Sequence, residues 1–199
     1  MRVKFCGLSR PEDIAAVNRV QPDYIGFVFV PASKRYVDEE KARELKAQLD
    51  PEIKAVGVFV NEDPQTIIQL LESGVIDIAQ LHGGESDEEI RTIQRYGEVI
   101  KAFKVKGKAE LEKAQASPAD YILLDGPAPG SGTGFDWNLL KECRRPYFLA
   151  GGIGPQNIEE AIALQPWALD LSSGLERAGK KEESLMRVVM AALERNRNE

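Results

Sequence analysis

The chain has 199 residues and a net charge of −6, with 43% hydrophobic and 29% charged residues. This length and balance predict one globular domain spanning residues 1–199. The acidic charge argues against general nucleic-acid binding, which needs a basic face. No apolar run approaches the roughly 20 residues of a membrane helix, and the N-terminus carries no signal-peptide pattern. We therefore expect a cytoplasmic protein with no membrane partner.

The few cysteine and histidine residues limit the possible cross-links and metal sites. Cys6 and Cys143 are the only cysteines, and His82 is the only histidine. A domain of this size can bury a core without a disulfide. Because neither residue type occurs at the spacing of a metal cluster, we expect no metal.

Apolar, β-rich runs alternate with polar, helix-patterned runs along the whole chain. Prolines at positions 11, 64 and 155 are typical of helix starts. In chain order the pattern predicts strand 3–6, helix 11–20, strand 24–30, helix 38–49, strand 54–60, helix 64–71, strand 76–81, helix 87–96, strand 99–105, helix 109–116, strand 121–125, a Gly/Pro-rich loop 126–134, a short helix from 137, strand 147–150, helix 156–164, strand 168–171 and helix 183–195.

The expected strands are continuous apolar runs, which are typical of a parallel sheet covered by helices on its faces. Eight strand–helix units in a row predict an α/β fold of the (β/α)8 TIM-barrel type. An open doubly wound sheet is the structural alternative. That fold usually has fewer units and a glycine-rich turn after its first strand, a pattern that Cys6-Gly7-Leu8 lacks.

Polar side chains stand where the expected strands end, which is where barrel enzymes place their chemistry. Cys6 ends the first strand and Asp125 ends the sixth. A closed barrel would let the two face each other across its mouth. Each also has a structural reading, since a free cysteine is often a small buried hydrophobe and an aspartate before glycine often caps a turn. Arg35 and His82 also follow expected strands. Arg35 could be a solvated surface charge, and His82 could be a hydrogen-bonded polar residue at a strand end.

Two glycine-containing segments follow the last two expected strands: "AGGIGPQN" and "LSSGLE". Glycine lets backbone N–H groups approach an anion closely, and a helix N-terminus adds positive potential. Each segment alone is typical of a tight turn. Because barrels often bind phosphate at these two loops, the pair predicts a phosphate site.

Several motifs match one known family, in that family's order. They are "KFCGLSRPED", "GFVFVPASKRYV", "VGVFVN", "QLHGGE", "LLDG…GSGTGFDW", "LAGGIGPQN" and "LDLSSGLE". They cover nearly the whole chain, which thus resembles the phosphoribosylanthranilate isomerases of tryptophan biosynthesis.

The resemblance implies a cofactor-free Amadori rearrangement of N-(5-phosphoribosyl)anthranilate to 1-(2-carboxyphenylamino)-1-deoxyribulose 5-phosphate. It implies that Cys6 is the general base, that Asp125 is the general acid and that Arg35 holds the anthranilate carboxylate. The expected partner is this small phosphorylated substrate, and the expected assembly is a monomer or a homodimer. The other implied substrate-binding residues are His82, Gly152, Gly154, Ser172, Ser173 and Gly174.

This chemistry needs each catalytic group in its minor protonation state. A free thiol has a pKa of about 8.5 and a free aspartate about 3.9, whereas the reaction uses a thiolate and a carboxylic acid. Negative charge on the substrate would raise the pKa of a nearby carboxyl group. A small reactive population is the alternative, and the sequence leaves both open.

Other barrel functions are the rivals. A metal-dependent phosphopentose epimerase needs several histidine ligands, and an indole-glycerol-phosphate synthase relative needs a lysine–glutamate pair; a thiamin-phosphate synthase relative is a third possibility. A phosphate-binding barrel without catalysis would keep both glycine loops. It would have no reason to set Cys6 opposite Asp125.

Overall fold

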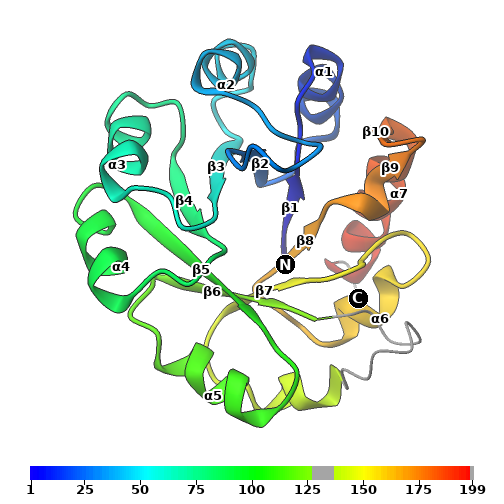
Figure 1. Cartoon of the computed structure of the whole chain (residues 1–199). Helices are drawn as coiled ribbons and strands as arrows, with labels where there is room; N and C mark the ends of the chain where they lie inside the picture. The colour runs from blue at the N-terminus through cyan, green and yellow to red at the C-terminus, as the bar shows by residue number, and fades with distance from the viewer. Residues whose placement is uncertain (127–136, 198–199) are drawn as a thin grey trace.

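Eight parallel strands close into a barrel in which each strand pairs with the next in sequence and β8 pairs with β1 (Figure 1). The predicted (β/α)8 TIM barrel is thereby confirmed. The computed structural model describes residues 1–126 and 137–197. The barrel strands are β1 Arg2–Cys6, β2 Tyr24–Val28, β3 Lys54–Phe59, β4 Ile78–Leu81, β5 Glu98–Lys104, β6 Tyr121–Asp125, β7 Tyr147–Ala150 and β8 Ala168–Leu171.

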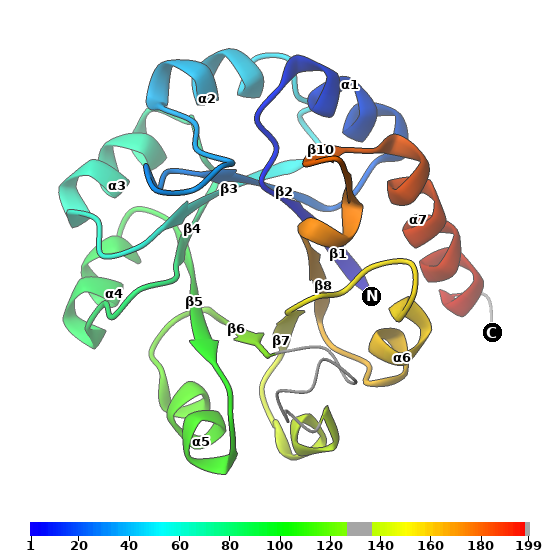
Figure 2. The ribbon, with the colours of Figure 1, turned by 45° about the vertical axis from the view of Figure 1, so that its right-hand side comes forward.

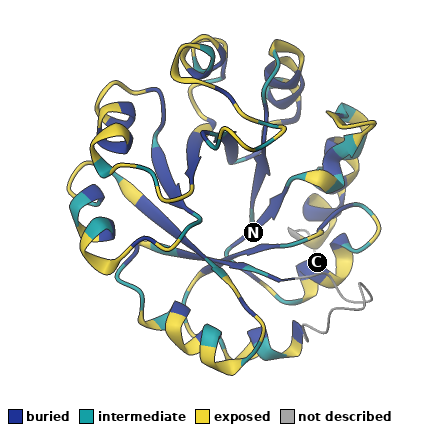
Figure 3. Cartoon of the chain, in the orientation of Figure 1, coloured by how far each residue is buried: buried dark blue, intermediate teal, exposed yellow. Residues whose placement is uncertain are grey.

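Helices encircle the strands on the outside of the barrel (Figures 1 and 2). Their inward faces are buried and their outward faces are exposed (Figure 3). The helices are α1 Pro11–Val20, α2 Glu39–Lys46, α3 Pro64–Glu72, α4 Asp87–Ile93, α5 Lys108–Ala116, α6 Ile158–Ala163 and α7 Glu183–Arg197, with 3₁₀ turns η1 Trp137–Glu142 and η2 Ser173–Leu175.

The strands are buried on both faces, which explains their continuous apolar sequences. Side chains alternate along each strand. One set fills the barrel interior, where Tyr24, Val56 and Phe148 belong to a compact buried cluster. The other set packs under the helices in a larger core that includes Phe5 and Phe59. The interior cluster fills the barrel below the polar residues at the C-terminal ends of the strands.

Two of the three expected proline starts are confirmed, because Pro11 and Pro64 occupy the first turns of α1 and α3. The third prediction was wrong. Pro155 lies in a turn, and α6 begins only at Ile158. The reason is local, since the side-chain oxygen of Asn157 accepts a hydrogen bond from the backbone N–H of Gly154 at 2.9 Å. The segment after β7 therefore folds as a turn before the helix starts.

A short antiparallel hairpin, β9 Glu176–Arg177 with β10 Lys180–Lys181, follows η2 and was not anticipated. Its turn contains Ala178 and Gly179, both at positive φ. The hairpin brings Glu176 and Lys181 side by side at the end of the barrel where β8 stops. Among the described residues, no helix is long and apolar enough to cross a membrane.

Candidate active site

A cavity of about 420 Å³ opens at the C-terminal ends of the barrel strands. Residues from seven of the eight strands or from the loops that follow them line it, all except β5. Its walls combine apolar and ionisable groups, as ligand sites do. The lining residues are Cys6, Val28, Val30, Ser33, Arg35, Val58, Val60, Gln80, His82, Asp125, Ala150, Gly151, Gly152, Ile153, Asp170, Ser172 and Ser173.

Cys6 is the last residue of β1, and its side chain points into the barrel. It is 8% exposed, so access to its sulfur is through the cavity. Gly26 is its partner across the strand pair, and a side chain there would meet the sulfur. Burial raises the pKa of the Cys6 thiol, while the ammonium groups of Lys4 and Lys181 act to lower it. The thiol is therefore neutral in most molecules at pH 7.

Asp125 ends β6, and its carboxylate lies close to the imidazole of His82. The distance between His82 Nε2 and Asp125 Oδ2 is 3.4 Å, and the two side chains are 27% and 32% exposed. On its other edge, His82 Nδ1 lies 3.4 Å from Nε2 of the buried Gln80. The contact with Gln80 orients the histidine ring, and the ring in turn limits the movement of Asp125.

Arg35 lies in the loop after β2, and its guanidinium group is held by Glu176 of the hairpin. Arg35 Nε and Nη2 donate to the two carboxylate oxygens at 2.6 and 3.0 Å. This contact uses one edge of the guanidinium fork, and among the described residues the edge formed by Nη1 and Nη2 has no second partner. Burial opposes the charge of Glu176, but the hydrogen bonds from Arg35 and Lys181 lower its pKa to about 2.

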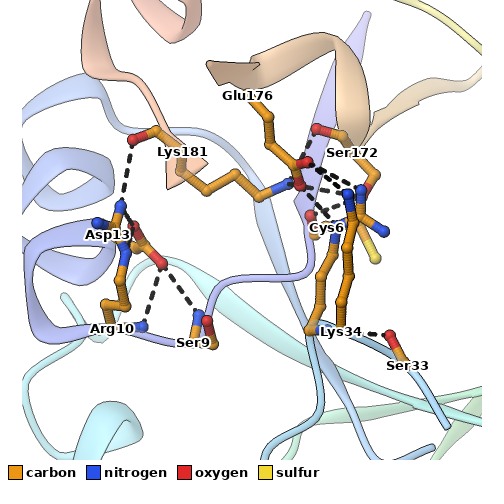
Figure 4. Close-up of polar contacts among 10 residues, drawn as sticks. Cys6, Ser9, Arg10, Asp13, Ser33, Lys34, Ser172, Glu176 and Lys181 are labelled. Carbon is orange, nitrogen blue, oxygen red and sulfur yellow. Dashed lines mark hydrogen bonds and ion pairs between the residues drawn. The ribbon is translucent and has the colours of Figure 1, made fainter. Parts of the chain in front are cut away.

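Lys181 connects this ion pair to the first strand (Figure 4). Its ammonium group donates to Glu176 at 2.9 Å and to the backbone oxygen of Ser172 at 2.9 Å. The hydroxyl of Ser172 donates to the backbone oxygen of Cys6 at 3.1 Å. These hydrogen bonds connect the hairpin, the loop after β8 and the end of β1, and they restrict movement on this side of the cavity.

The loops after β7 and β8 lie against each other through glycines. A β-carbon on Gly174 would come within 2.0 Å of the backbone oxygen of Ile153, and one on Gly154 within 3.1 Å of Gly174 Cα. In the described part of the chain, the backbone N–H groups of Gly152, Ser173 and Gly174 have no hydrogen-bond acceptor. Such unpaired donors on two adjacent turns can bind an anion.

The structure brings most of the expected residues into one cavity, and Cys6 and Asp125 line it together with Arg35 and His82. Gly152, Ser172 and Ser173 line it as well. Gly174 borders an adjoining hollow of about 730 Å³ that shares Gly152 and Ser173. Gly154 lies behind the glycine contact, with its N–H bonded to Asn157. Of the expected Gly/Pro-rich loop 126–134, residues 127–134 lie outside the described part of the chain.

Four charged residues near the cavity were missed by sequence reasoning: Lys4, Asp170, Glu176 and Lys181. The side chains of Lys4 and Asp170 are 0% and 8% exposed and form an ion pair. A charged residue inside an apolar strand was an available signal, because Lys4 shares its strand face with Cys6. Glu176 and Lys181 carried no such signal, since their roles depend on a hairpin that sequence reasoning did not predict.

Within the described residues, no group of three or more His, Cys, Asp or Glu side chains could hold a metal ion. The ionisable residues that line the cavity are Cys6, Arg35, His82, Asp125 and Asp170. A closed (β/α)8 barrel with such a cavity at the C-terminal strand ends defines a TIM-barrel enzyme.

Comparison with known proteins narrows this class. Residues 3–192 match the family model described as N-(5'-phosphoribosyl)anthranilate (PRA) isomerase. A relative of that name from Endomicrobium trichonymphae is 45% identical over 91% of this chain and 92% of its own. The chain therefore belongs to the N-(5'-phosphoribosyl)anthranilate isomerase family.

Solved structures agree in both fold and sequence. The phosphoribosyl anthranilate isomerase of Thermus thermophilus superposes with a TM-score of 0.87 at 40% identity, covering 98% of this chain and 100% of that one. Another phosphoribosyl anthranilate isomerase, in complex with reduced 1-(o-carboxyphenylamino)-1-deoxyribulose 5-phosphate, superposes with a TM-score of 0.88 at 36% identity, covering 98% of each chain.

Proposed function

We infer that the chain is a phosphoribosylanthranilate isomerase that converts N-(5-phosphoribosyl)anthranilate to 1-(2-carboxyphenylamino)-1-deoxyribulose 5-phosphate, a step of tryptophan biosynthesis. Family membership over nearly the whole chain supports the reaction. The observation that carries the assignment of roles is that Cys6, Asp125 and Arg35 line one cavity. We expect the enzyme to work in the cytoplasm as a monomer or a homodimer.

Asp125 is the general acid in this proposal. It gives its proton to the furanose ring oxygen, the C1–O bond breaks, and the nitrogen lone pair forms a Schiff base at C1. His82, 3.4 Å away, keeps the carboxyl group aimed at the sugar. The alkoxide that would otherwise leave is neutralised as a hydroxyl, so the ring opens without a high-energy anion.

Cys6 is the general base. Its sulfur removes the proton from C2 of the open-chain Schiff base, and the electron pair moves to give an enolamine. Tautomerisation of the enolamine yields the aminoketose product. The side chains from β1 and β6 act on different atoms of one sugar, so no residue has to serve both steps.

The two anionic ends of the substrate fix its position. The open edge of Arg35 donates two hydrogen bonds to the anthranilate carboxylate. The phosphate is held by the turns that contain Gly152, Gly154, Ser172, Ser173 and Gly174. The chemistry as written requires no cofactor.

Steady-state kinetics tests the assignment, using the difference in fluorescence between substrate and product. Cys6→Ser and Asp125→Asn should each lower kcat by about 10²- to 10⁴-fold, the usual contribution of general acid–base groups. Both keep the shape of the side chain, so affinity for a reduced product analogue should stay close to that of the wild type. Cys143→Ser is the matched control and should turn over normally. Wild-type turnover in either cavity variant would refute the assigned role.

A further inference from the structure

Lys4 is a buried cation directly below the candidate base. It precedes Cys6 by two residues on β1, so both side chains project into the barrel. The Lys4 side chain is completely buried, and its Nζ lies 3.0 Å from Oδ1 of Asp170 on β8. A buried charge is costly unless it is paired and hydrogen-bonded. Asp170 supplies this pairing for Lys4 through a single carboxylate oxygen.

The hydrogen bonding of Lys4 is incomplete when compared with the other buried lysines. An ammonium group has three donors, and Lys4 has one oxygen acceptor among the described residues, Asp170; the side chain of Cys6 is its other interaction partner. Lys101 on β5 reaches three backbone oxygens and Glu85. Lys181 reaches Ser172 and Glu176. Lys4 alone of the three has spare donors, and it lies beneath a thiol.

The charges that face Cys6 come from every side of this end of the barrel. Lys4 lies on the same strand, and Asp170 on the neighbouring strand β8. Lys181 comes from β10, and Arg35 from the loop after β2. Glu176 pairs with both Arg35 and Lys181 at the outer rim. Among the described residues, Lys4 is the cation that shares a strand face with Cys6 and has donors not taken up by oxygen atoms.

We propose that Lys4 is a positioning residue for the isomerisation, whose ammonium group stabilises the thiolate of Cys6 from beneath the cavity. This inference rests on the proposed role of Cys6 as the general base. When the thiol loses its proton, the negative sulfur gains a buried counter-ion with free N–H donors. The negative charge of Asp170 opposes the thiolate form of Cys6. The same carboxylate favours the protonated form of Lys4.

Lys4 and Cys6 shift each other's pKa in the directions expected if Lys4 stabilises the thiolate. Burial raises the pKa of the Cys6 thiol, Lys4 is the strongest influence that lowers it, and Asp170 raises it further. For Lys4, burial works against the charge, while Asp170 and Cys6 more than compensate and raise its pKa. Removing the charge of Lys4 should therefore raise the pKa of the Cys6 thiol further.

Alkylation of Cys6 by iodoacetamide, followed from pH 6 to 10, measures its thiolate population without any turnover. A Cys143→Ser background leaves one reactive thiol. Lys4→Met, which keeps the length but removes the charge, should react about tenfold more slowly at pH 7, as expected for loss of one nearby opposite charge. Lys101→Met, another buried lysine with a carboxylate partner, is the matched control and should leave the alkylation profile unchanged.

Unchanged or faster alkylation in Lys4→Met would overturn the proposal. If Lys4→Met does not fold by circular dichroism, Lys4→Gln replaces it under the same criterion: slower alkylation supports the proposal, and equal or faster alkylation refutes it. Parallel kinetics should show a fall in kcat for Lys4→Met with KM little changed. A wild-type protein that fails to turn over the substrate would refute the proposed function, while the alkylation result would still decide the role of Lys4.

Discussion

Gly26→Ala is expected to displace the catalytic sulfur while leaving the barrel folded. A β-carbon at Gly26 would lie 2.7 Å from Cys6 Sγ and 3.1 Å from Cys6 Cα. Normal contact requires about 3.5–4.0 Å, so the sulfur must move by roughly 1 Å. Overpacking of this kind costs about 1–3 kcal/mol of stability. Part of this is offset, by about 0.4–1 kcal/mol, because alanine restricts the unfolded chain.

The effect on the reaction should exceed the effect on stability. A misplacement of about 1 Å in a reacting group can reduce the rate by about 10²-fold. This factor corresponds to an increase of about 2.7 kcal/mol in the activation free energy. We expect kcat to fall by about that factor and KM to change little, since Gly26 does not line the cavity. The fluorescence assay gives both constants, and urea unfolding gives the stability.

Gly57→Ala on β3 is the matched control. A β-carbon there would lie 2.8 Å from side-chain atoms of Ile76 and Phe59, on the helix-facing side of the barrel. It should therefore cost similar stability without slowing the reaction. If both variants lost activity equally, or if Gly26→Ala kept the wild-type kcat, the reasoning that the glycine makes room for the sulfur would be wrong.

Two further changes test the rim of the cavity. The pKa of Glu176 is lowered to about 2, so its carboxylate contributes about 3 kcal/mol to the free energy of unfolding. This contribution is complete above about pH 4.5 and is lost as the pH falls towards 2. Glu176→Gln should therefore be less stable at pH 7 and lose less stability between pH 4.5 and 2, and urea unfolding with the same pH slope in both proteins would contradict this. Gly174→Ala would place a β-carbon 2.0 Å from the oxygen of Ile153. Overpacking of about 1–3 kcal/mol would separate the two glycine turns and raise KM by about tenfold or more; an unchanged KM would show that the phosphate binds elsewhere.

Much of the fold could be predicted because the signals are local. Strands buried on both faces need unbroken apolar runs such as residues 54–60, and eight alternations leave few topologies. The boundary errors were also local. The expected strand 76–81 begins at Ile78, whereas the short helix expected from residue 137 is present as the 3₁₀ helix η1.

The candidate site was only partly predictable. The strand-end rule indicated Cys6 and Asp125 because it depends on position along the chain. It gave no indication of Glu176, which pairs with Arg35 across 141 residues of sequence. The pairing of Lys4 with Asp170 spans 166 residues.

The sequence by itself determined the barrel, the end of the barrel that carries the cavity, and the glycine turns. These features follow from the hydrophobic periodicity, the order of the strands and the positions of the glycines, all of which can be read from the order of residues. Only the tertiary structure decided which charges face the thiol. The closure of β8 onto β1 brings Asp170 to Lys4, and the β9–β10 hairpin brings Glu176 to Arg35. Electrostatic interactions depend on distances in space, and those distances exist only once the barrel has closed.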